Sequence, residues 1–198
     1  DVDAFDYLVE IDEPLEDLGA TTLDDVSRAI GERVAERVPD GATVQLGIGA
    51  VPDASLLGLT QRRGLRVWSE MFSDGVLTLD AHQALDVDEP LIASFVFGSQ
   101  RLYEWVDLNP RVQLRRTETT NNPGTIAQCP QMVSVNAALQ VDLFGQANAS
   151  RINGRIYSGF GGQTDFIVGG LESLGGQARI ALRSWHPKAD CSTIIPLP

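Results

Sequence analysis

Short apolar runs alternate with amphipathic stretches along most of the chain, and this alternation predicts strands and helices that follow one another in turn. Strands are expected at residues 43–46, 65–71, 91–97, 112–116, 132–139 and 178–185. Helices are expected at residues 22–38, through Leu56–Leu59, and at 74–85 and 99–106. Strands that are joined through helices normally lie parallel and connect by right-handed crossovers. The predicted fold class is therefore α/β, with an open, mostly parallel sheet and helices on both faces.

The first helix has the clearest pattern in the chain. Apolar residues recur every four positions from Val26 to Val34, which would give the helix one buried face. Thr22 and Asp25 have the spacing of a capping box, with Asp in place of Glu or Gln. The helix is expected to stop before residues 39–41, whose Pro-Asp-Gly sequence is typical of a turn.

Glu70 ends an apolar strand, at the position where open α/β sheets usually bind their ligands. One interpretation is a carboxylate that caps the next helix or merely faces water. The other is a nucleophile that accepts acyl groups from a thioester. The second role would need nearby N–H groups to hold the oxyanion that forms during acyl transfer.

Two glycine-rich loops are candidates for supplying those N–H groups. Gly47-x-Gly49 directly follows a strand, and the loop Gly159–Gly162 opens a helix, although each is equally consistent with an ordinary turn. The first loop together with Glu70 also resembles a dinucleotide-binding fingerprint, in which the acid binds ribose hydroxyls. Pro52 weakens that interpretation, because it occupies a position where Gly or Ala is needed. A nucleotide-binding oxidoreductase domain remains an alternative.

Asn121 lies in a polar loop that follows another expected strand. Its amide could orient the Glu70 carboxylate or an incoming carbonyl by hydrogen bonds. It could equally form an Asx-turn or an N-cap ahead of Pro123. If Glu70, Asn121 and both glycine loops meet at one edge of the sheet, they would form an acyl-transfer site.

The composition narrows the class of partner. A formal net charge of -12 over 198 residues argues against nucleic acid and anionic membranes, and no apolar run is long enough for a membrane span. Cys129 and Cys191 are expected to be free buried thiols in a reducing compartment, which makes the cytoplasm the default location. His82 and His186 form no ligand pair, so no metal site is expected. A Ser-His-Asp triad stays open, but there is no G-x-S-x-G motif.

Five sequence blocks, in this order, resemble the acetyl-CoA hydrolase/transferase family of class I CoA-transferases. That family includes 4-hydroxybutyrate and succinyl-CoA:acetate CoA-transferases. The blocks are residues 39–54, 69–76, 93–99, 140–146 and 157–166. The resemblance runs from about residue 7 to the end of the chain, and it implies a Rossmann-like half of a CoA-transferase.

The resemblance implies a role for each candidate residue. Glu70 matches the family's catalytic glutamate, which attacks an acyl-CoA to give a mixed anhydride and then becomes a glutamyl-CoA thioester. Asn121 matches an asparagine that assists near the reacting carbonyl. Gly162 matches a residue whose backbone N–H serves the oxyanion. The positions implied to bind substrate or CoA are Gly47, Gly49, Gly159 and Gly161. Phe160 stands where the family usually has a smaller aliphatic residue, and this difference could narrow the acyl pocket.

The resemblance also implies the setting of the site. Residues 1–198 are expected to be a single α/β domain that corresponds to the C-terminal half of a two-domain protein, with residues 1–20 an extended linker or edge segment. The missing N-terminal half would complete the CoA cleft, and family members commonly form homodimers. Coenzyme A would be a substrate rather than a permanently bound cofactor, together with a small carboxylate. The alternatives are an acetyl-CoA hydrolase, or a regulatory or assembly domain without catalytic activity.

Overall fold

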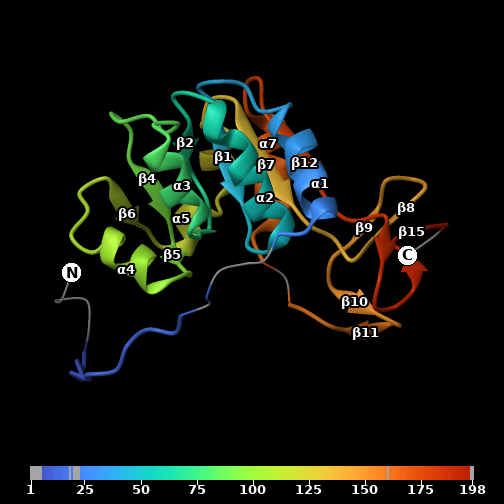
Figure 1. Cartoon of the computed structure of the whole chain (residues 1–198), viewed down its shortest axis with the longest axis horizontal. Coiled ribbons are helices and arrows are strands. Elements are labelled where there is room, and N and C mark those ends of the chain that lie inside the picture. Colours follow the sequence, from blue (N-terminus) through green and yellow to red (C-terminus); the bar gives the residue numbers. More distant parts are fainter. Residues whose placement is uncertain (1–5, 18, 20–22, 160, 197–198) are drawn as a thin grey trace.

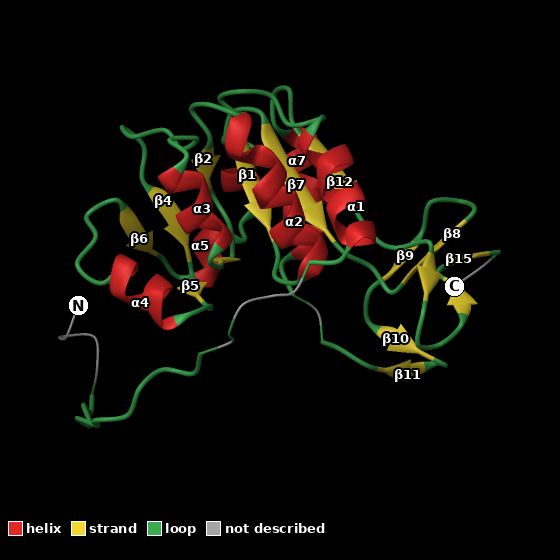
Figure 2. Cartoon of the chain, viewed as in Figure 1, coloured by secondary structure: helices red, strands yellow, loops and turns green. Residues whose placement is uncertain are grey.

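The computed structural model describes residues 6–17, 19, 23–159 and 161–196. Figures 1 and 2 show its helices and strands in order along the chain. The helices are α1 (Asp25–Ala35), α2 (Ala50–Gly58), α3 (Gly75–Ala81), α4 (Gln100–Val106), α5 (Thr117–Thr120), α6 (Pro123–Ile126) and α7 (Gln163–Glu172), with a 3-10 turn at Leu59–Gln61. The longer strands are β1 (Thr43–Leu46), β4 (Leu91–Ala93), β6 (Val112–Leu114), β7 (Met132–Asn136), β8 (Gln140–Asp142) and β12 (Gln177–Ile180). The two-residue strands are β2 (Arg66–Val67), β3 (Met71–Phe72), β5 (Phe95–Val96), β9 (Ala147–Asn148), β10 (Arg151–Ile152), β11 (Arg155–Ile156), β13 (Trp185–His186), β14 (Cys191–Ser192) and β15 (Ile194–Ile195).

A parallel sheet forms the centre of the molecule. Its strand order is β12-β7-β1-β2, and every neighbouring pair is parallel. Two further parallel pairs, β4 with β6 and β3 with β5, lie beyond β2, and a parallel bridge from Trp68 to Ile92 connects the two regions. Figure 1 shows α1 and α2 in front of the sheet and α7 behind it. The predicted α/β class with a mostly parallel sheet is confirmed.

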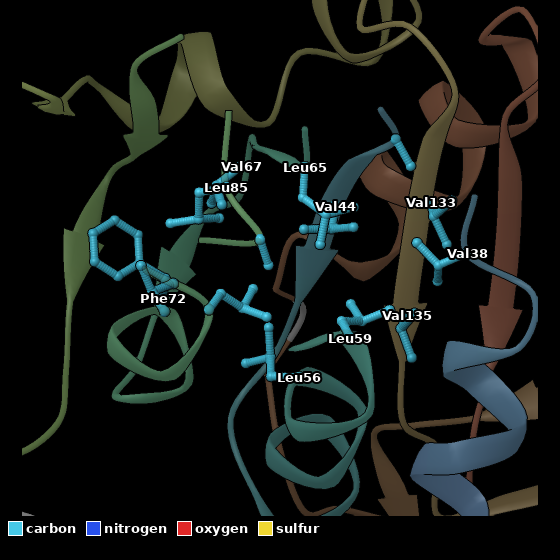
Figure 3. Close-up of a cluster of buried hydrophobic side chains, with 14 of the residues drawn as sticks. Val38, Val44, Leu56, Leu59, Leu65, Val67, Phe72, Leu85, Val133 and Val135 are labelled. Atoms are coloured by element: carbon cyan, nitrogen blue, oxygen red, sulfur yellow. The ribbon is translucent and has the colours of Figure 1, made fainter. Parts of the chain in front are cut away.

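Strand β7 shows how the sequence places a core on each face of the sheet. Val133 and Val135 pack into the large cluster with Leu56 of α2 (Figure 3). The alternate residue Met132 points to the opposite face, where it packs with Ile126 and Phe166. Successive side chains of a strand face opposite sides, so a strand covered by helices on both faces is apolar on both.

Helices α1 and α2 pack closely because a glycine faces the neighbouring backbone. A Cβ added to Gly31 would lie 2.4 Å from the carbonyl carbon of Ala54. Asp24 caps α1, since its side chain accepts a hydrogen bond from the backbone N–H of Ser27 at 2.9 Å. The predicted cap at Thr22 was wrong in its position, and Thr22 itself lies outside the described residues.

The strand expected at 65–71 is interrupted rather than continuous. β2 ends at Val67 and β3 begins at Met71, so Glu70 lies inside the interruption and not at the final carboxyl end of the strand. The neighbouring strand expected at 91–97 also divides, because Ser94 separates β4 from β5. The carbonyl of Glu70 accepts hydrogen bonds from the N–H groups of Ser94 at 2.8 Å and Phe95 at 3.3 Å. The two interruptions therefore lie side by side and are joined to each other.

Some expected boundaries differ from the structure. The strand at 91–97 is not covered throughout, since Phe95 is 46% exposed. The late strand expected at 178–185 ends at Ile180. Apart from β12, the strands that follow β7 are short and lie in small sheets, and Figure 2 shows β8 to β11 and β15 beside the main sheet. In the part of the chain that the structure describes, no helix is both long and apolar enough to cross a membrane.

Candidate active site

Glu70, Asn121 and Gly162 meet at one point in the structure. The backbone N–H of Gly162 donates to Glu70 Oε2 at 2.9 Å, and Asn121 Nδ2 donates to the same oxygen at 3.1 Å. These partners lie 92 and 51 residues away from Glu70 along the chain. Three of the residues singled out in the sequence are thus brought together by the fold.

The neighbours of Trp68 and Glu70 show on which face of the sheet the Glu70 side chain lies. Trp68 packs against the cluster of Ile126, Met132 and Phe166, behind the sheet, and its indole N–H donates to the carbonyl of Thr120 at 2.9 Å. The side chain of Glu70, two residues later, reaches the N-terminus of α7 on this same face. The residue that ends α5, Asn121, and the residue that starts α7, Gly162, supply the partners of the carboxylate.

Gly162 is a glycine because its neighbours leave no room for a side chain. A Cβ at this position would lie 2.3 Å from Glu70 Oε2 and 2.6 Å from Asn121 Nδ2. Its φ of -69° is accessible to any residue, so the requirement is for space and not for backbone freedom. Gly162 is also the N-cap of the ten-residue helix α7. The carboxylate therefore lies at a helix N-terminus, where the helix dipole favours negative charge.

Asn121 is free to hold Glu70 because its neighbour caps the next helix. The side chain of Asn122 accepts from the backbone N–H of Thr125 at 3.1 Å and so serves as the N-cap of α6. Asn121 is the C-cap residue of α5, and its amide turns toward Glu70 instead. The N-cap interpretation therefore belongs to Asn122, one residue later than the sequence suggested.

Two hydroxyl residues behind Asn121 were not singled out in the sequence. Thr120 is fully buried, and its Oγ1 donates to Asn121 Oδ1 at 3.0 Å. The same Oγ1 lies 2.6 Å from Ser94 Oγ. Thr120 stands directly before Asn121 in the chain, but its contact with Ser94 joins positions 26 residues apart and has no local sequence signal.

The other predicted glycines are not needed to make room for the carboxylate. A Cβ added to Gly47, Gly49, Gly159 or Gly161 would meet nothing within 4 Å, so packing does not require glycine at any of these positions. Gly49 does require it for another reason, since its φ is +114° at the N-cap of α2. Phe160 lies outside the described residues.

Gly49 lines a cleft whose lining does not include Glu70. A cleft of about 920 Å³ is lined by Ile48 and Gly49 on one side and by Ser73 and Asp74, just after β3, on another. Its lining does not include Glu70, Asn121 or Gly162. The acid of the supposed dinucleotide fingerprint therefore faces α7 and Asn121, away from the glycine loop with which that fingerprint would pair it.

The cysteines are free, as expected, but differ in exposure. Cys129 is partly buried, and burial raises the pKa of its thiol to about 11. Cys191 is exposed, so the expectation of a buried thiol was wrong there. Within the described ranges, no group of three or more His, Cys, Asp or Glu residues is arranged to hold a metal ion.

A parallel α/β sheet with a carboxylate held at a helix N-terminus defines an α/β domain with a candidate acyl-transfer site. The model of the acetyl-CoA hydrolase/transferase C-terminal domain matches residues 98–197, and the chain belongs to this family. The 4-hydroxybutyrate coenzyme A transferase of Clostridium kluyveri is 42% identical over 99% of the chain and 47% of its own length. The acetyl-CoA hydrolase of Saccharomyces cerevisiae is 31% identical over 89% of the chain and 36% of its own length.

A solved structure is similar over nearly the same extent. The 4-hydroxybutyrate CoA-transferase from Porphyromonas gingivalis has a TM-score of 0.84 and 34% identity, over 96% of this chain and 46% of that one. The chain spans about half the length of the curated relatives that it matches. Its relatives in this family include CoA-transferases and acetyl-CoA hydrolases.

Proposed function

We propose that the protein transfers coenzyme A between a short-chain acyl-CoA, such as acetyl-CoA, and a free carboxylate, with Glu70 as the nucleophile. The observation that carries the proposal is the pair of hydrogen bonds at Glu70 Oε2, from Asn121 at 3.1 Å and Gly162 at 2.9 Å. In the described part of the chain both donors bind this one oxygen. Oε1 is then the oxygen available to attack the thioester. The two hydrogen bonds to Oε2 fix the direction in which Oε1 points.

The reaction begins when Glu70 Oε1 attacks the thioester carbonyl carbon of the acyl-CoA. The C–S bond breaks, CoA leaves as the thiolate, and an acyl-glutamyl mixed anhydride remains. The thiolate then attacks the glutamyl carbonyl carbon, the original acid leaves as its carboxylate, and Glu70 carries CoA as a thioester. A second carboxylate attacks that thioester, and the same steps in reverse release the new acyl-CoA. Every step is a displacement at a carbonyl, without any redox change.

Asn121 and Gly162 act most strongly while the glutamyl carbon is the electrophile. When the thiolate or the second carboxylate attacks Glu70, negative charge develops on Oε2, where both donors already point. Donors placed at hydrogen-bond distance from a developing oxyanion stabilise the transition state without reorganising. The position of Gly162 at the N-terminus of α7 adds the favourable field of the helix dipole.

The proposal includes the setting of the site, for which the family resemblance is the support. CoA is a substrate rather than a permanently bound cofactor, and the loops at Gly47–Gly49 and Gly159–Gly161 supply backbone N–H groups for it. The N-terminal half found in the relatives completes the cleft, and the active protein is a cytoplasmic homodimer. A hydrolase is the second candidate, because the family description includes acetyl-CoA hydrolases and Glu70 is only partly buried, within reach of water.

The test is to trap the covalent intermediate. The complete protein is incubated with acetyl-CoA, treated with borohydride or hydroxylamine, digested, and mapped by mass spectrometry. Modification is expected at Glu70 and is expected to disappear in Glu70→Gln. Glu172→Gln is the matched control, since Glu172 is an exposed carboxylate at the far end of α7. Full activity in Glu70→Gln would end the proposal.

The transferase and the hydrolase are separated by the fate of CoA. With acetyl-CoA and added succinate, 4-hydroxybutyrate or butyrate, a transferase accumulates the new acyl-CoA at the expense of acetyl-CoA. A hydrolase releases free CoA at a rate that does not depend on the added acid.

A further inference from the structure

We infer that Thr120 and Ser94 are positioning residues, which fix the orientation of the Asn121 amide and through it the Glu70 carboxylate. The inference rests on the proposed role of Glu70. It concerns a chain of three hydrogen bonds: Ser94 Oγ to Thr120 Oγ1 at 2.6 Å, Thr120 Oγ1 to Asn121 Oδ1 at 3.0 Å, and Asn121 Nδ2 to Glu70 Oε2 at 3.1 Å.

The Glu70 carboxylate determines which atom donates and which accepts in each of these three hydrogen bonds. A carboxylate only accepts hydrogen bonds, so the atom of Asn121 that faces Glu70 must be the nitrogen. The amide oxygen is then left facing Thr120, whose hydroxyl has to donate to it. A hydroxyl has one proton, so Thr120 can only accept from Ser94, and Ser94 Oγ is the donor.

The series of hydrogen bonds forms a closed ring through the backbone of Ser94. The N–H of Ser94 donates to the carbonyl of Glu70 at 2.8 Å, while its hydroxyl begins the path that ends at the Glu70 carboxylate. Ser94 therefore holds Glu70 at both its main chain and its side chain. Ser94 is the residue between β4 and β5, and it lies directly opposite the interruption at Glu70.

The hydrogen bond from Thr120 to Asn121 is not easily replaced by another one. Among the described residues, its hydroxyl also lies 2.6 Å from Ser94 Oγ, which acts as the donor in that pair, and 3.4 Å from the carbonyl of Thr117. Thr120 has no exposed surface, so bulk water cannot replace a lost hydroxyl without opening the packing. Its carbonyl is held separately by the Trp68 indole, so the main chain keeps its anchor when the side chain changes.

Removing the hydroxyl would leave the Asn121 oxygen without a donor. The amide could then rotate by half a turn and present Oδ1 to the Glu70 carboxylate, where two acceptors repel. Glu70 would lose one of the two donors on Oε2, together with its fixed direction. A buried polar atom left without its partner is costly, which favours this rearrangement.

The test measures the rate of adduct formation at Glu70 and the kcat and KM for acyl-CoA in the complete protein. Thr120→Val is expected to lower the adduct rate and kcat about ten-fold, the order that one lost hydrogen bond to a charged site produces, with KM nearly unchanged. Thr120→Ser keeps the hydroxyl and is expected to stay within about two-fold of the parent protein. Thr117→Val makes the same chemical change on an exposed side chain of the same helix and serves as the matched control.

A double-variant comparison separates positioning from a merely structural role. In an Asn121→Ala background the effect of Thr120→Val is expected to vanish, because Thr120 acts through the amide. Equal losses in Thr120→Val and Thr120→Ser would overturn the inference. So would a loss from Thr120→Val that persists in full without Asn121.

A crystal structure of Thr120→Val tests the inference even if Glu70 turns out not to form an adduct. The distance from Asn121 Nδ2 to Glu70 Oε2 is expected to lengthen beyond hydrogen-bonding range, or the carboxylate to turn away. An unchanged distance of 3.1 Å would reject the inference. Absence of any adduct in the parent protein would instead reject the proposed function, and the two failures are therefore distinguishable.

Discussion

Gly162 and Glu70 lie so close together that no side chain could stand between them. The N–H of Gly162 donates to Glu70 Oε2 at 2.9 Å, and a Cβ at position 162 would lie 2.3 Å from that oxygen. A larger residue at position 162 can be accommodated in only two ways: the carboxylate rotates away, or α7 moves back. Either movement breaks the hydrogen bond, so the glycine and the carboxylate work as a unit.

Gly162→Ala is therefore expected to lower kcat by about 10²- to 10³-fold, the range found when one donor of an oxyanion site is lost. Steady-state kinetics and the rate of adduct formation at Glu70 measure the effect. The comparison is Thr164→Ala, at an exposed position in the first turn of α7 that leaves the contact at Glu70 in place. A loss equal to that of Gly162→Ala would show that crowding at the carboxylate is not the cause.

Asn121→Asp is expected to be more damaging than Asn121→Ala. Both remove the donor to Glu70 Oε2, but Asp also places a second negative charge about 3 Å from the carboxylate, where like charges repel. We expect kcat/KM to fall about 10²-fold in Asn121→Ala and further in Asn121→Asp. Equal values for the two variants would contradict the idea that the amide opposes a charged group.

Gly31→Ala is expected to destabilise the fold by about 1–3 kcal/mol, because a Cβ would lie 2.4 Å from the backbone of Ala54 and would force α1 away from α2. The measurement is chemical unfolding followed by circular dichroism. Glu32→Ala, on the exposed side of the same helix, is the control and should change the free energy of unfolding by no more than about 0.5 kcal/mol. Gly31→Ala with an unchanged unfolding midpoint would show that the helices can separate at no cost.

Cys129 and Cys191 are expected to differ in their reactivity toward iodoacetamide. The nucleophile is the thiolate, and burial raises the pKa of Cys129 to about 11, so its thiol stays protonated at pH 8. Cys191 is exposed and accessible to the reagent. Peptide mapping after brief alkylation of the native protein should find carbamidomethyl on Cys191 and very little on Cys129. Equal labelling in the native protein, with no unfolding, would contradict the burial of Cys129.

The sequence predicted the architecture well where the signal is local. Helix α1 follows from its four-residue apolar spacing, and the parallel order of strands follows from their alternation with helices. Boundaries were less accurate wherever distant partners decide them. The strand expected to end at Glu70 continues as Met71–Phe72, because the backbone of a neighbouring strand pairs with both residues of that segment.

The candidate site was predictable in part. Glu70, Asn121 and Gly162 were singled out from their positions in the chain and from the family resemblance, and the structure brings these three together. Thr120 and Ser94 were missed because their hydroxyl groups matter only through contacts that join separate crossovers. No periodicity or spacing within one segment reports such a contact.

The two hydrogen bonds to the Glu70 carboxylate also have a consequence for how the protein folds. The carboxylate finds its partners 51 and 92 residues further along, in two later crossovers of the sheet. Local structure forms before contacts between distant segments, so the Glu70 carboxylate has both of its donors only once α7 has docked against the sheet. The ability to form a covalent adduct at Glu70 would then appear only at the end of folding. The time course of adduct formation during refolding would therefore report when α7 docks.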